Sequence, residues 1–223
     1  MTRRVKTLLS WSSGKDSAWT LDSLRRDDRC ELVGLATTIN EAAGRVAMHA
    51  VRTELLRAQA AAARLALWEV PIPSPCSNEQ YQCAMGALIA RAEAEGVEQM
   101  AFGDLFLEDV RAYREHQLAA TRLVPLFPLW GRPTAVLARE MIDGGLRASI
   151  TCVDPRQIDR TFAGREFDAA LLAALPPTAD PCGERGEFHT FAYAGPMFAA
   201  PVAFTRGEVV ERDGFVFADL LVA

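Results

Sequence analysis

The chain has no long uninterrupted run of apolar residues, although half of its 223 residues are hydrophobic. A membrane-spanning helix needs about 18 to 20 such residues in a row. The basic start of the chain leads directly into a strand-like segment, without the apolar region of a cleavable leader. We therefore expect a globular, cytoplasmic protein with a sizeable core.

Cysteines are few and scattered, and no two of them form a C-x-x-C pair. The five are Cys30, Cys76, Cys83, Cys152 and Cys182. An odd, unpaired set of this kind argues against a disulfide framework and against a structural zinc site.

Positive charge is not in excess either, since 29 acidic residues face 24 basic ones and the net charge is −5. Proteins that bind nucleic acids electrostatically usually present a basic surface. We therefore expect no nucleic-acid partner.

A run of small and charged residues lies between a β-prone segment (residues 5–9) and a segment with helical spacing of apolar residues (17–24). A loop in this position faces the unpaired N–H groups and the positive dipole end of a helix, which favour anions. An ordinary helix-capping turn remains the alternative. The predicted phosphate loop comprises Ser10, Ser12, Ser13, Gly14, Lys15, Asp16 and Ser17.

Asp16 is unusual in such a loop, because a carboxylate repels phosphate unless a cation lies between them. We therefore expect Mg²⁺ to bridge Asp16 and the phosphate oxygens. A Walker A loop does not fit, since it requires an earlier glycine and a Ser or Thr straight after its lysine.

Strand-like and helical segments alternate through the first half of the chain. Strands are predicted at residues 30–39, 67–71 and 98–102, and helices at 48–62 (with Met48 as its first apolar position) and 78–95. This alternation predicts an α/β fold, with a parallel sheet and helices on both faces. Ligands of such sheets bind at the carboxyl ends of the strands, where the phosphate loop is joined by Thr37, Thr38, Gly103 and Asp104.

A segment with three prolines, residues 125–133, predicts a domain boundary. We assign residues 1–125 to the nucleotide-binding domain and residues 126–223 to a smaller α+β domain that binds substrate. The second domain is expected to hold helices at 134–143 and 167–175, and strands at 146–153, 188–193, 202–211 and 215–222.

A second group of chemically active residues lies at positions 180–191. Flexible glycines flank Glu184 and Glu187, which could reach into a cleft to bind metal, an amine or a cationic substrate group. His189 is a candidate acid or base. The alternative is a solvated turn that leads into a strand.

The loop at residues 12–17 resembles the PP-loop, Ser-Gly-Gly-x-Asp-Ser, of ATP pyrophosphatases, with Ser13 at the first glycine of that pattern. Nearly the whole chain resembles the diphthine–ammonia ligase family, as a bacterial-type member. The stretches that carry this resemblance are residues 12–17, Gly103 with Arg111 and Glu115, residues 128–130, 164–165, 182–187, 190–191 and 195–196.

The resemblance implies a HUP-type (Rossmann-like) nucleotide domain, cleavage of ATP to AMP and pyrophosphate, and a carboxylate that is adenylated and then amidated by ammonia. A homodimer is a further expectation from the family. The run after the fourth strand retains Arg111 and Glu115 but lacks the family's Tyr-Gln pair. Diphthamide belongs to archaea and eukaryotes, so we expect a bacterial member to use a different, smaller acceptor.

We assign a role to each candidate residue, from the residue types and strand ends and from the resemblance together. The loop holds the triphosphate, Thr37, Thr38 and Gly103 line the nucleotide site, and Asp104 assists the metal at Asp16. The acceptor is expected to contact Arg111, Glu115, Glu184, Glu187, His189 and Thr190.

Two rival functions remain open at this level. A PP-loop sulfur transferase acting on RNA would need a persulfide carrier, for which Cys76, Cys83 and Cys182 are the candidates. A sensor that holds ATP or AMP without turnover is the other.

Overall fold

Two β-sheets form the framework of the chain. The computed structural model describes residues 3–42, 44–46 and 51–223. Sheet A contains six strands: β1 (Val5–Ser10), β2 (Cys30–Asn40), β3 (Arg45–Val46), β4 (Leu67–Ile72), β5 (Gln99–Ala101) and β6 (Val124–Leu126).

The parallel strands of sheet A run in the order β4-β2-β1-β5-β6, and β3 pairs antiparallel with the end of β2. The chain moves outward in one direction from β1 to β4, and then crosses to the other side of β1 for β5. A switch of this kind leaves a crevice beyond the carboxyl ends of β1 and β5, which is where ligands bind in doubly wound sheets.

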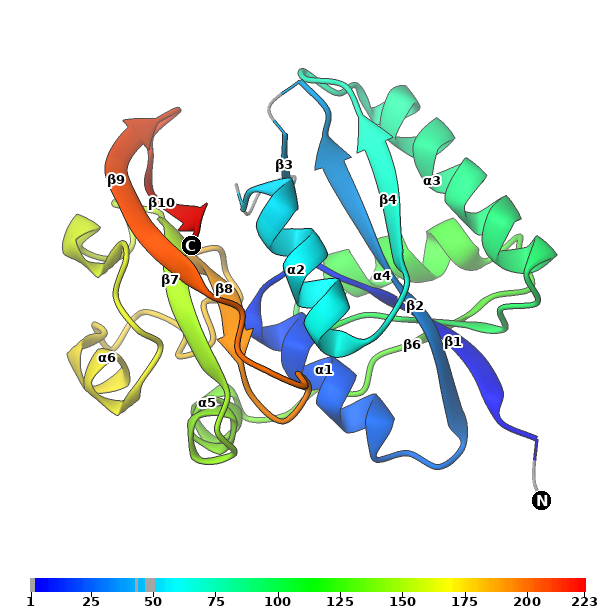
Figure 1. Cartoon of the computed structure of the whole chain (residues 1–223), viewed down its shortest axis with the longest axis horizontal. Coiled ribbons are helices and arrows are strands. Elements are labelled where there is room, and N and C mark those ends of the chain that lie inside the picture. The colour runs from blue at the N-terminus through cyan, green and yellow to red at the C-terminus, as the bar shows by residue number, and fades with distance from the viewer. Residues whose placement is uncertain (1–2, 43, 47–50) are drawn as a thin grey trace.

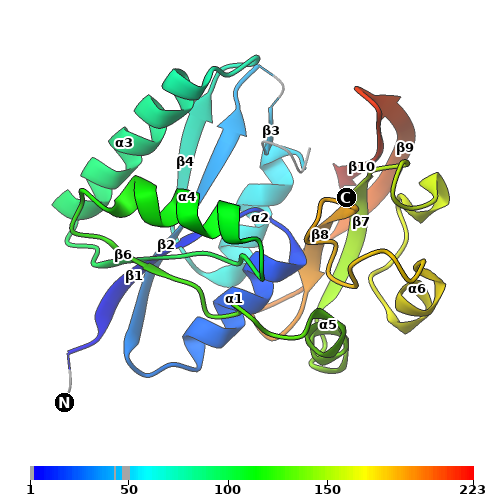
Figure 2. The ribbon, with the colours of Figure 1, turned by 180° about the vertical axis from the view of Figure 1, so that it is seen from behind.

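Helices cover both faces of sheet A (Figures 1 and 2). One face carries α1 (Lys15–Arg25) and α2 (Thr53–Ala63), and the other carries α3 (Asn78–Ala94) and α4 (Glu108–Leu118). Two apolar clusters result, one on each side, and the α1–α2 cluster continues without interruption into the second sheet. The predicted α/β class is confirmed.

Sheet B is antiparallel, with strand order β8-β7-β10-β9. Asp213 and Gly214 both have positive φ angles, of 51° and 79°, in the β9–β10 turn, as the predicted hairpin requires. The second half of the chain comprises α5 (Thr134–Asp143), β7 (Arg147–Val153), a 3₁₀ turn (Arg160–Phe162), α6 (Ala169–Ala174), β8 (Phe188–Ala194), β9 (Phe204–Arg212) and β10 (Phe215–Val222).

Polar contacts tie sheet B to the first half of the chain. The Asp219 carboxylate on β10 pairs with Arg45 at 2.9 Å and with Arg52 at 2.6 Å. These pairs and the shared apolar cluster hold the two sheets against each other. In the described part of the chain, no helix is long and apolar enough to cross a bilayer.

The structure departs from the sequence predictions in several places. The helix α4 was not predicted, and the proline-rich segment begins inside sheet A, where Pro125 lies opposite Met100 in β6. The predicted domain boundary at residue 125 therefore falls within a strand. Proline is tolerated there because β6 is an edge strand. Met48, the predicted start of the second helix, lies outside the described residues, and α2 begins at Thr53.

Candidate active site

The β1–α1 loop lies at the carboxyl end of β1 and is held by long-range hydrogen bonds. The Ser13 carbonyl accepts a hydrogen bond from the Ala192 N–H of β8 and another from Gln59 Nε2, both at 2.9 Å. Gln59 is fully buried on α2, and its Oε1 accepts from the Trp11 indole at 3.1 Å. Gln59 therefore positions the loop, a role that its sequence context did not reveal.

Small side chains within the loop hydrogen-bond to one another. The hydroxyls of Ser12 and Ser17 lie 3.1 Å apart, and Ser17 Oγ donates to the Gly14 carbonyl at 3.0 Å. Gly14 is the N-cap residue of α1 and has no side chain, so it does not itself cap the N–H groups of the first turn, which can bind an anion. A loop of small residues thus precedes the helix, and its binding of phosphate stays a prediction.

Ser13 adopts a left-handed backbone conformation, with φ of 67°. Its hydroxyl is buried and has no hydrogen-bond partner among the described residues. Both features are unfavourable for serine, and glycine removes both. We expect Ser13→Gly to raise the free energy of unfolding by about 1 kcal/mol, measured by urea denaturation. As a control, Ser12→Gly removes two loop hydrogen bonds and should lower the free energy of unfolding. Equal effects of the two substitutions would contradict backbone strain at Ser13.

Lys15 is buried, with 2% of its side chain exposed. Its ammonium lies 2.8 Å from Asp16 Oδ2, donates to the Cys182 carbonyl, and stands over the rings of Phe167 and Phe188. Burial disfavours the charged form, but the Asp16 carboxylate outweighs it and raises the pKa of Lys15. The side chain thus joins the loop to the second half of the chain.

Two carboxylates lie in the crevice beside the loop. Asp16 follows Lys15, and Asp104 follows β5; both line a cavity of about 230 Å³. Gly103 lets these segments approach, because a Cβ there would stand 3.1 Å from the backbone of Asp16 and Ser17. Burial raises the pKa values of both carboxyls, against the opposing effects of Lys15 on Asp16 and of Arg114 on Asp104.

The carboxylate pair fits a magnesium ion. Asp16 Oδ1 and Asp104 Oδ2 are buried and accept no hydrogen bond from the residues that the structure describes. No cluster of three metal-binding side chains occurs in residues 3–42, 44–46 and 51–223. Mg²⁺ typically takes one or two carboxylates and fills its remaining positions with phosphate oxygens and water, so two carboxylates are sufficient.

A loop from the second half of the chain closes the other side of this cavity. Glu184 lines the cavity, and its Oε1 accepts a hydrogen bond from the Leu105 N–H at 2.7 Å. Glu187 does not line the cavity: it is 1% exposed, and its carboxylate accepts from the N–H groups of Asp180 and Arg185. The structure therefore brings Glu184 to the site and uses Glu187 to shape the loop.

Burial raises the pKa of Glu184 to about 7, and the nearby Asp16 and Asp104 carboxylates add to that shift. A carboxyl with a raised folded pKa binds a proton on folding, so its contribution to stability is full below pH 4.5 and is lost as the pH rises through 7. We expect Glu184→Gln to exceed the wild type in stability by about 2 kcal/mol at pH 8 and to match it near pH 4.5. Thermal unfolding across this pH range tests this, and parallel curves would contradict it.

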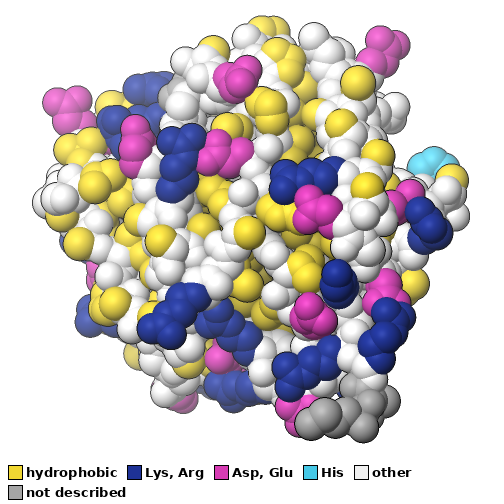
Figure 3. All heavy atoms as spheres, turned by 45° about the vertical axis from the view of Figure 1, so that its right-hand side comes forward, with side chains coloured by type: hydrophobic (Ala, Val, Ile, Leu, Met, Phe, Trp, Pro, Cys, Tyr) yellow, Lys and Arg dark blue, Asp and Glu magenta, His cyan; other side chains and the backbone are white. Residues whose placement is uncertain are grey.

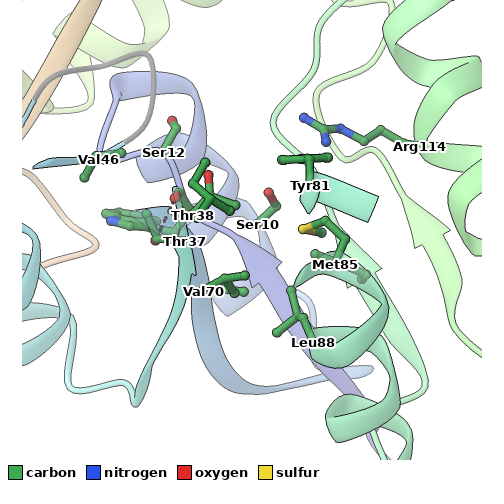
Figure 4. A pocket seen from close by; sticks show the side chains of 14 residues that line it. Ser10, Ser12, Thr37, Thr38, Val46, Val70, Tyr81, Met85, Leu88 and Arg114 are labelled. Carbon is green, nitrogen blue, oxygen red and sulfur yellow. Dashed lines mark hydrogen bonds between the residues drawn. The ribbon is translucent and has the colours of Figure 1, made fainter. Parts of the chain in front are cut away.

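A second cavity, of about 380 Å³, adjoins the first (Figure 4). Thr37 and Thr38 from β2 line it together with Val70, Met85 and Leu88. Thr37 Oγ1 also donates to the Trp11 carbonyl at 2.7 Å. A largely apolar cavity at the ends of β1 and β2 suits a nucleoside, where Thr37 and Thr38 were predicted to lie.

Arg114, which the sequence did not single out, lies where the two cavities meet. Ser10, Ser12 and Arg114 line both cavities, and the Arg114 guanidinium extends from α4 into the nucleoside cavity (Figure 4). Its Nε is buried, 3.8 Å from Asp104 Oδ2, and has no hydrogen-bond partner in the described chain. Helical spacing in the sequence could have indicated Arg114. Leu107, Val110 and Arg114 are three and four positions apart, and all three line the same cavity.

Arg111 and Glu115 lie on α4 but line neither cavity. Arg111 Nε donates to Glu115 at 2.7 Å, and its guanidinium stacks over the rings of Phe127 and Trp130. The structure thus does not bring these two predicted substrate contacts into the cavities.

His189 and Thr190 lie on β8 at the edge of the first cavity. Burial lowers the pKa of His189 to about 4, with a smaller effect of Lys15, so its imidazole is neutral at pH 7. Thr190 Oγ1 accepts a hydrogen bond from the Lys15 N–H at 3.0 Å, which fixes the start of α1 against β8.

The cysteines do not gather at the site. All five thiols are free, and burial raises the pKa values of Cys152, to about 12, and of Cys182 above its usual range. A reactive thiol needs a lowered pKa. Cys76 and Cys83 line neither of the two cavities, so the geometry lends no support to a persulfide carrier.

Comparison with known proteins finds sequence similarity to one group of enzymes. Residues 133–217 match a family model described as the diphthamide synthase C-terminal domain. Diphthine–ammonia ligase of Bos taurus is 27% identical over 153 residues, which cover 66% of this chain and 57% of the relative. The enzyme of Homo sapiens is 28% identical over 148 residues, covering 64% and 55%. The chain spans little more than half the length of these relatives. The chain is therefore similar to diphthine–ammonia ligases, and residues 133–217 carry the likeness to the C-terminal domain of diphthamide synthase.

Proposed function

We propose that the protein is an ATP-dependent ligase that adenylates a carboxylate and amidates it with ammonia. The observation that carries this proposal is the cavity that Asp16, Asp104 and Glu184 share. It joins a nucleoside-sized cavity on one side and a loop from the second half of the chain on the other. A nucleotide and an acceptor can therefore meet at one point.

In the proposed reaction, a carboxylate oxygen of the acceptor bonds to the α-phosphorus of ATP and pyrophosphate leaves. Ammonia then attacks the acyl carbon, AMP leaves, and one proton is released. Bound Mg²⁺ would supply charge neutralisation for the pyrophosphate, held by Asp16 with Asp104. Such chemistry depends on positioning and electrostatic stabilisation more than on a protein nucleophile.

Different residues of the chain bind different parts of the substrates. The helix N-terminus and the serines of the loop hold phosphate oxygens, and the cavity lined by Thr37 and Thr38 holds the nucleoside. Glu184, whose pKa of about 7 lets it exchange a proton near neutral pH, faces the position where ammonium or a cationic substrate group would enter.

The product of the nucleotide tests the proposal. With α-labelled ATP, Mg²⁺, ammonium and a panel of carboxylic acids, we expect AMP and pyrophosphate, with release that depends on both the acid and ammonium. ADP as the product would refute the proposal. Tight nucleotide binding with no AMP from any acid would identify a sensor instead.

Arg114 and Arg111 make a matched pair for the same assay. Arg114→Ala removes the only arginine that lines both cavities among the described residues, and we expect it to lower kcat for AMP formation about a hundredfold. Arg111 lies one helical turn away. Arg111→Ala should keep kcat within about threefold of the wild type, because it loses only a surface ion pair and ring stacking. Equal losses for the two variants would show that α4 as a whole, and not Arg114, matters.

A further inference from the structure

A row of side chains crosses sheet B from the candidate active site to the outer hairpin. His189 on β8 lies opposite Cys152 on β7, Cys152 lies opposite Phe217 on β10, and Phe217 lies opposite Val210 on β9. All four line a cavity of about 870 Å³. They therefore share one face of the sheet.

The same cavity is bounded on its other side by the first half of the chain. Asn40, Arg45 and Val46, at the ends of β2 and β3, face sheet B across it, and Figure 1 shows these strand ends opposite the β9–β10 hairpin. The Asp219 pairs with Arg45 and Arg52 hold the two sides together. The cavity is thus a groove between the two sheets.

This groove adjoins the candidate active site at His189. His189 lines both the groove and the cavity of Asp16, Asp104 and Glu184. The proposed function assigns the nucleoside and the phosphates to the other two cavities. It leaves the groove for the remaining atoms of an acceptor whose carboxylate reaches the α-phosphorus.

The lining of the groove restricts the chemistry of that acceptor. We call the apolar residues Phe215, Phe217 and Val210 the floor of the groove; three acidic and two basic residues also line it. Such a surface suits an apolar body, and three acids against two bases disfavour a polyanion. Figure 3 brings forward the opposite side of the molecule, the right-hand side of Figure 1, where acidic and basic side chains are interspersed.

We infer that the acceptor is a carboxylic acid with an extended apolar body, which lies along the row His189, Cys152, Phe217 and Val210. The inference rests on the proposed function for the position of the carboxylate. Adjacent strands are about 4.8 Å apart, so three steps across the sheet give the body a length of roughly 14 Å. A small polar acid would leave the groove empty.

Probe binding tests the inference without ATP or ammonia. The probe is undecanoic acid with a fluorescent dansyl group at its far end, titrated into the full chain. We expect saturable binding that Val210→Asp weakens at least about tenfold, because a carboxylate then enters the apolar floor. Val209→Asp is the matched control, because the neighbouring Val209 is 56% exposed and does not line the groove. The affinity of this variant for the probe should stay within about twofold of the wild type.

Folding of each variant is checked by circular dichroism, and Val210→Trp, which fills the groove with an apolar ring, replaces Val210→Asp if the latter does not fold. Absence of probe binding, or equal weakening by Val209→Asp and Val210→Asp, would overturn the inference. A third outcome would also overturn it: the chain does not bind the probe but self-associates, and Val210→Asp abolishes that self-association. The groove would then hold a second copy of the chain.

Turnover separates this inference from the proposed function. In a series of unbranched carboxylic acids, we expect kcat/KM for AMP formation to rise with chain length in the wild type, and Val210→Asp to remove that rise. AMP formation from short polar acids alone would refute the inference and leave the proposed function standing. Groove-specific probe binding without AMP from any acid would refute only the proposed function.

Discussion

Replacing Lys15 by methionine is expected to lower ATP-dependent AMP formation about a thousandfold in a protein that still folds. The change removes the ammonium that contacts Asp16 and the Cys182 carbonyl, and it keeps an apolar chain against Phe167 and Phe188. Because the Asp16 carboxylate loses its partner, the free energy of unfolding should also fall, by about 2 kcal/mol. Steady-state AMP release and urea denaturation measure the two effects.

Lys6 provides the control, since it is the only other lysine of the chain. Among the described residues, its ammonium donates a hydrogen bond only to the Glu95 carbonyl, at 3.3 Å. Lys6→Met should leave AMP formation within about twofold. A folded Lys15→Met variant with nearly wild-type turnover would mean that Lys15 merely joins the loop to the 182–187 segment.

Asp16→Asn is expected to lower AMP formation about a hundredfold at low Mg²⁺ and to raise the Mg²⁺ concentration needed for half-maximal turnover about tenfold. The amide keeps the shape of the side chain and removes one of the two carboxylates with an unpartnered buried oxygen. Asp104→Asn should act in the same direction. The double variant should lose less than the product of the single effects, because the two residues serve one ion.

A second readout does not depend on turnover. Mg²⁺ together with ATP should raise the melting temperature of the wild type, and this rise should be much smaller in Asp16→Asn. Asp109→Asn, an exposed residue in the first turn of α4, is the control. An unchanged Mg²⁺ requirement in both Asp16→Asn and Asp104→Asn would rule out this carboxylate pair as the metal site.

The β1–α1 loop and the alternation of strands and helices were predictable because they depend on local patterns. Apolar residues at strand or helix spacing and a run of small residues before a helix are visible in a short window. The position of Asp104 followed from the rule that parallel strands end at one edge of a sheet. The strand β6 was missed because proline usually signals a break, and only its place at the sheet edge makes it acceptable.

Among similar residues, the sequence could not choose those that face the site. Arg111 and Arg114 are three positions apart on one helix, and the packing of α4 against sheet A turns Arg114 into the cavities and Arg111 toward Trp130. Glu184 and Glu187 are likewise three positions apart, and of the two only Glu184 lines the cavity. Gly183 and Gly186, with φ angles of 68° and 84°, turn the loop so that Glu184 reaches Leu105 and Glu187 points into its own loop.

Local backbone preferences and apolar periodicity were enough to predict the β1–α1 loop, the parallel sheet and the position of that loop at the carboxyl ends of the strands. Three features became visible only in the packed structure: Gln59 and Thr190 hold the loop, Arg114 and Glu184 line the cavity, and sheet B presents an apolar groove beside it. Those contacts join residues that are far apart in the chain, and their geometry depends on how helices and sheets pack together.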